Sequence, residues 1–151
     1  MDYHFVFATG GAIPAGAQPN GNEASGDPLW VARTVGGVSS LPGVQLGKVR
    51  PGLGAALFPF GGNEVADQYE VLMEQGLWVD SDGTGRIPIG AIVCGEDVDN
   101  APLFVARAMF QGGLHPGKTK FGFNAASIGF GGKEQFVTPY QILVSQLNSL
   151  H

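Results

Sequence analysis

The sequence predicts an all-β domain made of two tandem, pseudo-symmetric repeats, and three observations support this prediction. Its 25 Gly and 10 Pro in 151 residues are too many for long helices but suit short strands joined by tight turns. Its apolar runs are short and recur in step along the chain. Residues 11–33 align without a gap on residues 85–107 with 11 of 23 positions identical, and residues 47–64 align on residues 117–134 with 9 of 18 identical. A repeat of this length indicates two copies of one supersecondary unit.

The two copies are expected to share one core. A chain of 151 residues has the usual size of a single domain, whereas a copy of about 60 to 70 residues would be marginal as an independent core. We therefore expect one domain over residues 1–151, with a first repeat at residues 5–75 and a second at residues 76–147. Their antiparallel sheets should enclose the shared core.

Strands are expected where matching apolar segments occur in both copies. Each copy opens with an Ile-Pro-x-Gly-Ala segment, at Ile13 and at Ile87, which is expected to be extended. The later strands are expected at residues 29–32, 55–60, 69–73, 103–106, 125–130 and 140–144. The last of these segments, taken to residue 147, is also compatible with a short terminal helix. Residues 76–85, between the copies, indicate the start of a strand followed by a turn.

Charge and hydropathy argue against several classes of protein. A net charge of -5 with only eight Lys and Arg disfavours nucleic acid and anionic membranes as partners, because both are bound through basic surfaces. No segment approaches the roughly 18 apolar residues of a membrane span, so membrane insertion is not expected. The acidic N-terminus does not fit a signal peptide, which predicts a cytoplasmic or non-conventionally secreted protein. The single Cys94 cannot form an internal disulfide and is expected to be a small buried or turn residue.

Charged residues are few, yet most of the basic ones recur at equivalent positions. The repeated pairs are Glu23 and Asp97, Arg33 and Arg107, Lys48 and Lys118, Arg50 and Lys120, and Glu64 and Glu134. One interpretation is structural, with the arginines at strand ends forming cross-strand ion pairs with Glu64 or Glu134. The other is that an acid and a lysine on neighbouring loops bind a hexose, since a carboxylate accepts hydrogen bonds from vicinal hydroxyls and an ammonium donates to a third oxygen.

A series of short motifs runs through both copies and is most complete in the second. The motifs are Ile-Pro-x-x-Ala, Gly-x-Asp, apolar-x-x-Ala-Arg-Ala, Pro-Gly-Lys, Gly-Gly-Lys-Glu and Tyr-x-x-Leu. From about residue 5 to residue 144, this series resembles the tandem DM9-repeat proteins, which include mannose-binding lectins of marine molluscs. The resemblance implies an all-β homodimer in which mannose is held by the Asp of Gly-x-Asp and the Lys of Pro-Gly-Lys. In this sequence those residues are Asp97 and Lys118.

The first copy departs from this pattern. Glu23 stands in place of the Asp, and four additional residues precede its lysine. Alignment on Gly47-Lys48, rather than on Pro42-Gly43, keeps the spacing to Glu64 and makes Lys48 the equivalent of Lys118. An acidic residue that some family members carry shortly before the lysine is absent from both copies, so specificity can differ from plain mannose.

Supporting roles are assigned by position. Glu64 and Glu134 are candidates to orient the lysines, and Arg33 and Arg107 are the other supporting candidates. Aromatic residues at strand positions, such as Trp30 and Phe104, are expected in the core rather than against a sugar.

These residues favour a lectin that binds mannose or mannose-rich glycans and gains avidity from repeated sites and dimerisation. The resemblance further implies a role in pathogen recognition, and so in innate immunity. A non-catalytic interaction scaffold is the first alternative, and it would be favoured if Asp97 and Lys118 bonded each other in a closed contact. A glycoside hydrolase is the second, but no carboxylate pair within one copy is obviously catalytic and no histidine is repeated. Catalytic residues, metal ligands and a cofactor are not expected.

Overall fold

The computed structural model describes residues 3–145, which form fourteen β-strands and no helix and so confirm the all-β prediction. The first half of the chain contains β1 (Phe5–Ala8), β2 (Gly21–Asn22), β3 (Pro28–Thr34), β4 (Leu46–Val49), β5 (Ala56–Phe60), β6 (Asn63–Asp67) and β7 (Tyr69–Leu72). The second half contains β8 (Leu77–Asp80), β9 (Val93–Glu96), β10 (Pro102–Phe110), β11 (Gly113–Thr119), β12 (Ala126–Phe130), β13 (Lys133–Val137) and β14 (Gln141–Val144). Within residues 3–145, no helix is long and apolar enough to cross a membrane.

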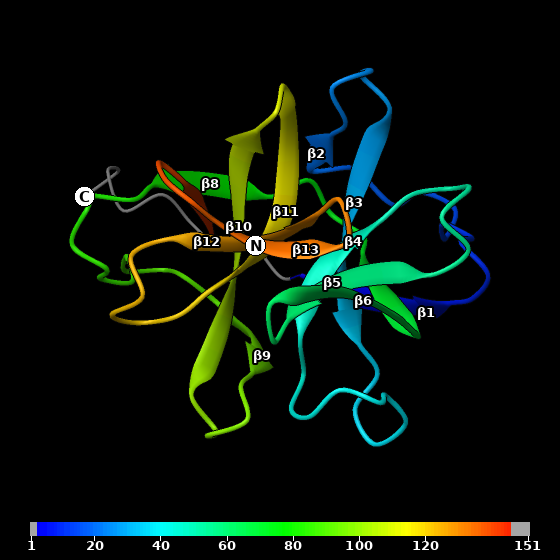
Figure 1. Cartoon of the computed structure of the whole chain (residues 1–151), viewed down its shortest axis with the longest axis horizontal. Coiled ribbons are helices and arrows are strands. Elements are labelled where there is room, and N and C mark those ends of the chain that lie inside the picture. Colours follow the sequence, from blue (N-terminus) through cyan, green and yellow to red (C-terminus); the bar gives the residue numbers. More distant parts are fainter. Residues whose placement is uncertain (1–2, 146–151) are drawn as a thin grey trace.

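Hydrogen bonds join the strands into one antiparallel sheet whose order shows the internal symmetry. The order is β1-β7-β3-β4-β5-β6-β13-β12-β11-β10-β14-β8. Each strand of the first half therefore has a counterpart at the mirrored position of the second half. The two halves meet where Asn63 of β6 pairs with Lys133 of β13. In Figure 1 the halves lie side by side, with β1, β3 and β5 on the right and β8, β10 and β12 on the left.

The short strands β2 and β9 reach across to the opposite half. β2 pairs with β3 of its own half and, through Asn22 and Leu114, with β11. In the same way Glu96, at the end of β9, forms a bridge with Val44 just before β4. Glycines permit these crossings, because a Cβ on Gly21 or Gly95 would lie 2.4 Å from a carbonyl oxygen of the other half. The acidic turns that follow β2 and β9 are thereby held near that half.

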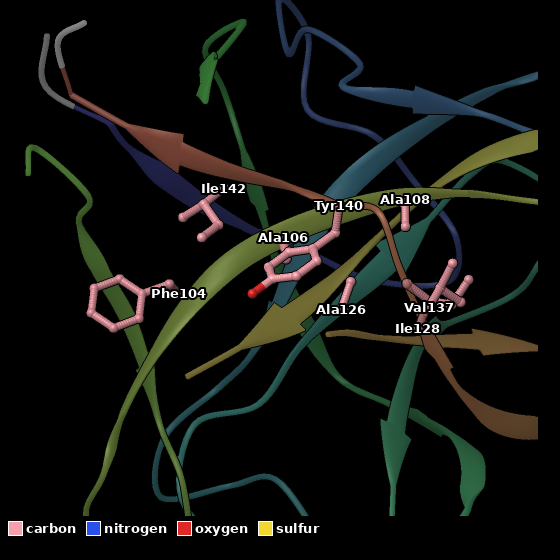
Figure 2. Packing of buried hydrophobic residues seen from close by; sticks show 8 residues of the cluster. All are labelled: Phe104, Ala106, Ala108, Ala126, Ile128, Val137, Tyr140 and Ile142. Carbon is pink, nitrogen blue, oxygen red and sulfur yellow. The ribbon is translucent and has the colours of Figure 1, made fainter. Parts of the chain in front are cut away.

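Buried side chains form three clusters, one in each half and one between them. Figure 2 shows the cluster of the second half, where Phe104, Ile128, Tyr140 and their neighbours pack together. The central cluster combines residues from both halves, namely Val31, Leu46, Leu72, Cys94, Leu103, Val105 and Leu143. Burial raises the pKa of Cys94 to about 11, so this thiol is a packing group, as the sequence predicts.

The Ile-Pro segments of both copies are turns, so the prediction that they are extended is wrong. Gly16 and Gly90 have φ angles of 87° and 93°, which interrupt an extended path. The side chains of Ile13 and Ile87 instead pack onto the outer clusters. The last apolar segment is the strand β14 and not a helix, and residues 146 and 147 lie outside the described part of the chain.

Strands β4 and β11 lie where the sequence predicts loops, although they carry the two lysines. All four residues of β4 are buried, so the strand lacks the alternation of apolar and polar residues that identifies a half-buried strand. Gly47 and Gly117 face neighbouring backbone, where a Cβ would lie 2.1 Å from the Leu57 oxygen or 2.0 Å from the Ser127 oxygen. The Gly-Lys pairs therefore mark close strand contacts rather than turns.

We predict that Gly117→Ala lowers the free energy of unfolding by at least about 1–3 kcal/mol, the usual cost of overpacking, because backbone must move to admit the methyl group. Gly36→Ala is the matched control, since a Cβ there meets only Val44 at 3.9 Å. Urea unfolding of both variants tests the prediction. An equal effect of the two substitutions would contradict it.

Candidate functional site

The two lysines occupy equivalent strand positions. Lys118 pairs with Val105 across β10 and β11, and Lys48 pairs with Val31 across β3 and β4. This register confirms the alignment on Gly47-Lys48. Lys48 and Lys118 are only 4% and 8% exposed, so burial lowers the pKa of both, while neighbouring carboxylates act in the opposite direction.

Each lysine is held by the opposite half of the molecule. Lys118 Nζ donates to the Pro59 carbonyl oxygen, and Lys48 Nζ donates to the equivalent Gly129 oxygen, both at 2.7 Å. Each ammonium also lies over a phenylalanine ring of the other half, Phe60 for Lys118 at 5.3 Å from the centroid and Phe130 for Lys48 at 5.8 Å. We call this arrangement the reciprocal lysine clasp.

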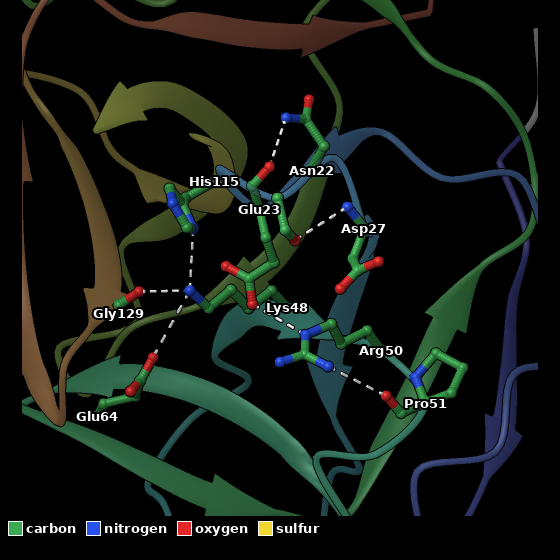
Figure 3. A network of polar contacts seen from close by, with 10 residues as sticks. Asn22, Glu23, Asp27, Lys48, Arg50, Pro51, Glu64, His115 and Gly129 are labelled. Atoms are coloured by element: carbon green, nitrogen blue, oxygen red, sulfur yellow. Dashed lines mark hydrogen bonds and ion pairs between the residues drawn. The ribbon is translucent and has the colours of Figure 1, made fainter. Parts of the chain in front are cut away.

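The clasp is completed by the side chain three positions before the lysine of the other half. Lys118 Nζ donates to Gln45 Oε1 at 2.6 Å, and Lys48 Nζ contacts His115 Nδ1 at 3.0 Å. Burial, reinforced by the charge of Lys48, lowers the pKa of His115 to about 4. His115 is therefore neutral at pH 7, and its Nδ1 accepts a hydrogen bond from the Lys48 ammonium. Figure 3 shows this contact. The sequence comparison overlooks Gln45 and His115 because their side chains differ.

The two acids of the Gly-x-acid motifs lie in turns, as predicted, after β2 and β9. Asp97 Oδ2 accepts a hydrogen bond from Lys120 Nζ at 2.9 Å, and Glu23 Oε2 accepts one from Arg50 Nε at 2.9 Å. Burial acts to raise the pKa of Asp97, but hydrogen bonds from Lys120 and the Val98 amide and the nearby lysine charges hold it below its usual value. Asp97 thus bonds Lys120 and not Lys118, so the closed contact that would favour an interaction scaffold is not formed.

Glu64 and Glu134 lie beside the lysines but differ in their partners. Ser127 Oγ donates to Glu134 Oε2 at 2.5 Å, and the Gly62 amide donates to its other oxygen. The equivalent of Ser127 is Leu57, which cannot donate a hydrogen bond. Among residues 3–145, Glu64 Oε2 accordingly has no hydrogen-bond partner and instead lies 3.8 Å from Lys48 Nζ. The first-half lysine is therefore closed by its glutamate, whereas no such ion pair joins Lys118 and Glu134 among residues 3–145.

A cavity of about 230 Å³ opens on the second-half site. Three of the predicted residues, Asp97, Lys118 and Glu134, line it together. The other lining residues are Phe60, Gly61, Leu103, Thr119, Lys120, Phe123, Ser127 and Phe136. Its charged groups are two acids and two lysines, so the cavity suits a neutral ligand with several hydroxyl groups.

Two aromatic residues that the sequence analysis does not identify, Phe123 and Phe136, also line this cavity. Phe123 and Phe136 pack edge to face with centroids 5.3 Å apart, and they are 38% and 61% exposed. Their first-copy equivalents are Leu53 and Ala66. The signal that could have identified them is an aromatic residue present in only one copy.

Arg33 and Arg107 lie apart from the lysines. Arg33 Nε bonds Glu70 at 2.6 Å and stacks over Phe5, while Arg107 Nε bonds Gln141 at 2.8 Å and stacks over Trp78. The predicted ion pairs with Glu64 or Glu134 are therefore wrong, and neither arginine lines the cavity. The sequence can indicate which residues of a strand share a face, but it does not show which neighbouring strand supplies the ion-pair partner of each arginine.

Within residues 3–145, no group of three or more His, Cys, Asp or Glu could hold a metal ion.

Comparisons with known proteins agree with this architecture. A family model described as DM9 repeat matches residues 1–66 and 35–137. No curated protein sequence gives a significant match. The crystal structure of the nematode sperm cell motility protein MFP2B is similar, with a TM-score of 0.58 and 17% identity over 94% of this chain and 45% of that one. The chain thus spans less than half of that protein, and the likeness shows the fold alone.

We predict that His115→Gln, which installs the residue found at the equivalent position 45, reduces the loss of stability in acid. Because the folded-state pKa of His115 is about 4, below its unfolded value of about 6.5, the unfolded chain gains a proton first as pH falls. The wild type should therefore lose up to about 3 kcal/mol between pH 6.5 and pH 4 from this group alone.

Urea unfolding at pH 7, 6, 5 and 4 measures the effect. The difference in stability between the variant and the wild type should shift in favour of the variant toward pH 4. Parallel pH profiles would show that His115 is not held neutral.

Proposed function

Because the chain belongs to the DM9-repeat family, we propose that it is a non-catalytic carbohydrate-binding protein that recognises mannose or mannose-containing glycans. The observation that carries this proposal is the convergence of Asp97, Lys118 and Glu134 on one cavity beside aromatic side chains. Its volume of about 230 Å³ is below the roughly 300–1,000 Å³ of sites for drug-sized ligands, which favours a single sugar unit.

Each polar group of the cavity matches a feature of a hexose. Asp97 retains lone pairs for hydroxyl groups beyond its bonds to Lys120 and the Val98 amide. Lys118 uses two of its ammonium protons within the protein and keeps a donor for a sugar oxygen. Phe123 and Phe136 offer an apolar surface to the C–H face of the ring. Together these groups can bind an uncharged polyol such as a hexose.

The second-half site is proposed to bind more strongly than the first. In the first half, Lys48 is occupied by His115 and Gly129 and lies near Glu64, while Glu23 is paired with Arg50. Glu23 and Lys48 form the corresponding weaker site. Since a shallow monosaccharide site binds weakly, a homodimer would supply avidity. Recognition of pathogen glycans by a cytoplasmic or non-conventionally secreted protein is part of this proposal.

Binding without catalysis fits the ionisation of Asp97. A glycoside hydrolase needs a carboxylic acid whose pKa is raised so that it can protonate the leaving group. The pKa of Asp97 is lowered instead. An interaction scaffold is the second candidate, favoured by the large exposed side chains of Phe121 and Phe136, which are 76% and 61% exposed.

We predict that Asp97→Asn and Lys118→Met each weaken mannose binding at least tenfold. Each substitution removes a charge-assisted hydrogen bond, worth about 1.5–3 kcal/mol, and keeps most of the side-chain volume. A glycan array identifies the ligand, and calorimetry on folded protein, checked by circular dichroism, measures its affinity.

The matched substitutions Glu23→Gln and Lys48→Met should have a smaller effect on affinity. Loss of binding only in these first-half variants would overturn the assignment of the stronger site. If no glycan bound the folded wild type, the lectin function itself would be rejected, and the scaffold candidate would replace it.

A further inference from the structure

A second cavity, of about 560 Å³, lies beside Arg107 and shares no residue with the cavity at Lys118. Strands β8, β10, β11 and β14 contribute to it. Its lining includes the polar side chains of Arg107, Gln141 and Asp80 and the apolar side chains of Met109, Leu114 and Pro139. Met109 is 59% exposed, so this part of the apolar lining is accessible to a ligand.

The internal repeat shows what is unusual about Arg107. Arg33 and Arg107 occupy equivalent positions, stack over Phe5 and Trp78 at 4.2 and 4.1 Å, and face the equivalent residues Glu70 and Gln141 across the sheet. In the first half, Glu70 neutralises the guanidinium with a 2.6 Å ion pair. In the second half the partner is the neutral amide of Gln141. Among residues 3–145, no carboxylate forms an ion pair with Arg107.

The guanidinium of Arg107 is oriented but keeps free donors. Its Nε donates to Gln141 Oε1 at 2.8 Å, and one terminal nitrogen donates to the backbone carbonyl oxygen of Asn20 at 2.9 Å. The remaining N–H groups have no hydrogen-bond partner within the described residues. Burial lowers the pKa of Arg107 to about 10, so it remains a cation at neutral pH although half-buried. A planar, stacked guanidinium of this kind recognises carboxylates.

The rest of the lining restricts the ligand. Asp80 accepts a hydrogen bond from the Gln141 amide at 3.0 Å, and its negative charge disfavours ligands with more than one anionic group. Met109, Leu114 and Pro139 favour an apolar tail. We propose that this cavity binds a small organic monocarboxylate, with the carboxylate on Arg107 and the tail against the apolar side chains of the lining.

The test is a titration of isotope-labelled protein with hexanoate, in which binding is monitored through the backbone amide chemical shifts. Hexanoate should cause saturable shifts around Arg107, Met109 and Gln141 and leave the amides of Asp97 and Lys118 in place. The neutral 1-hexanol and inorganic phosphate should bind at least tenfold more weakly, because each lacks one of the two features.

Gln141→Glu is the decisive variant, since it places in the second half the acid that Glu70 provides in the first. It should fold, because the same pairing exists at Arg33, and its affinity for hexanoate should fall at least tenfold. Glu70→Gln, a matched change at the distant arginine, should leave the shifts around Arg107 unchanged. The proposal is overturned if hexanoate causes no shifts there, if hexanol or phosphate binds equally well, or if Gln141→Glu binds like the wild type. A mannose titration reports separately on the other cavity.

Discussion

The reciprocal lysine clasp is the interaction on which the arrangement of the two halves depends. An ammonium can be buried only if hydrogen-bond acceptors replace the water that it loses. For Lys48 and Lys118, both direct hydrogen-bond acceptors come from the opposite half. Neither half alone could bury its lysine without leaving that charge unsatisfied. The clasp and the mixed hydrophobic cluster together explain why two similar units form one folded body.

Small differences between the copies turn one symmetric framework into two unlike sites. Ser127 holds Glu134 by a hydrogen bond, whereas Leu57 leaves Glu64 to approach Lys48. Asp97 has a shorter side chain than Glu23. The second copy carries Phe123 and Phe136 where the first copy has Leu53 and Ala66. Each difference involves a side chain and leaves the strand order unchanged. The backbone thus supplies the positions, and a few side chains decide which site is open.

Comparison of the two copies within one sequence is enough to predict the fold class, the equivalence of Lys48 and Lys118, the turn position of Asp97 and a buried or turn position for Cys94. It could not predict the partners of the lysines, because an internal alignment matches residues that are equivalent and not residues that touch. For this reason, and because the two side chains differ, the comparison of the copies does not identify Gln45 and His115 as lysine partners. The sequence predicts loops where the strands that carry the lysines lie, because buried strands show no polar alternation and their glycines mark close backbone contacts rather than turns.

The position of His115 also constrains how the chain can evolve. This residue belongs to the second copy, yet its side chain contacts the lysine of the first, and Gln45 does the reverse. A substitution at either position is therefore felt by the copy in which it did not occur. The effects of mutations in the two copies should not be independent, and duplicated sequences joined in this way diverge as a coupled pair, with each change in one altering which changes the other tolerates.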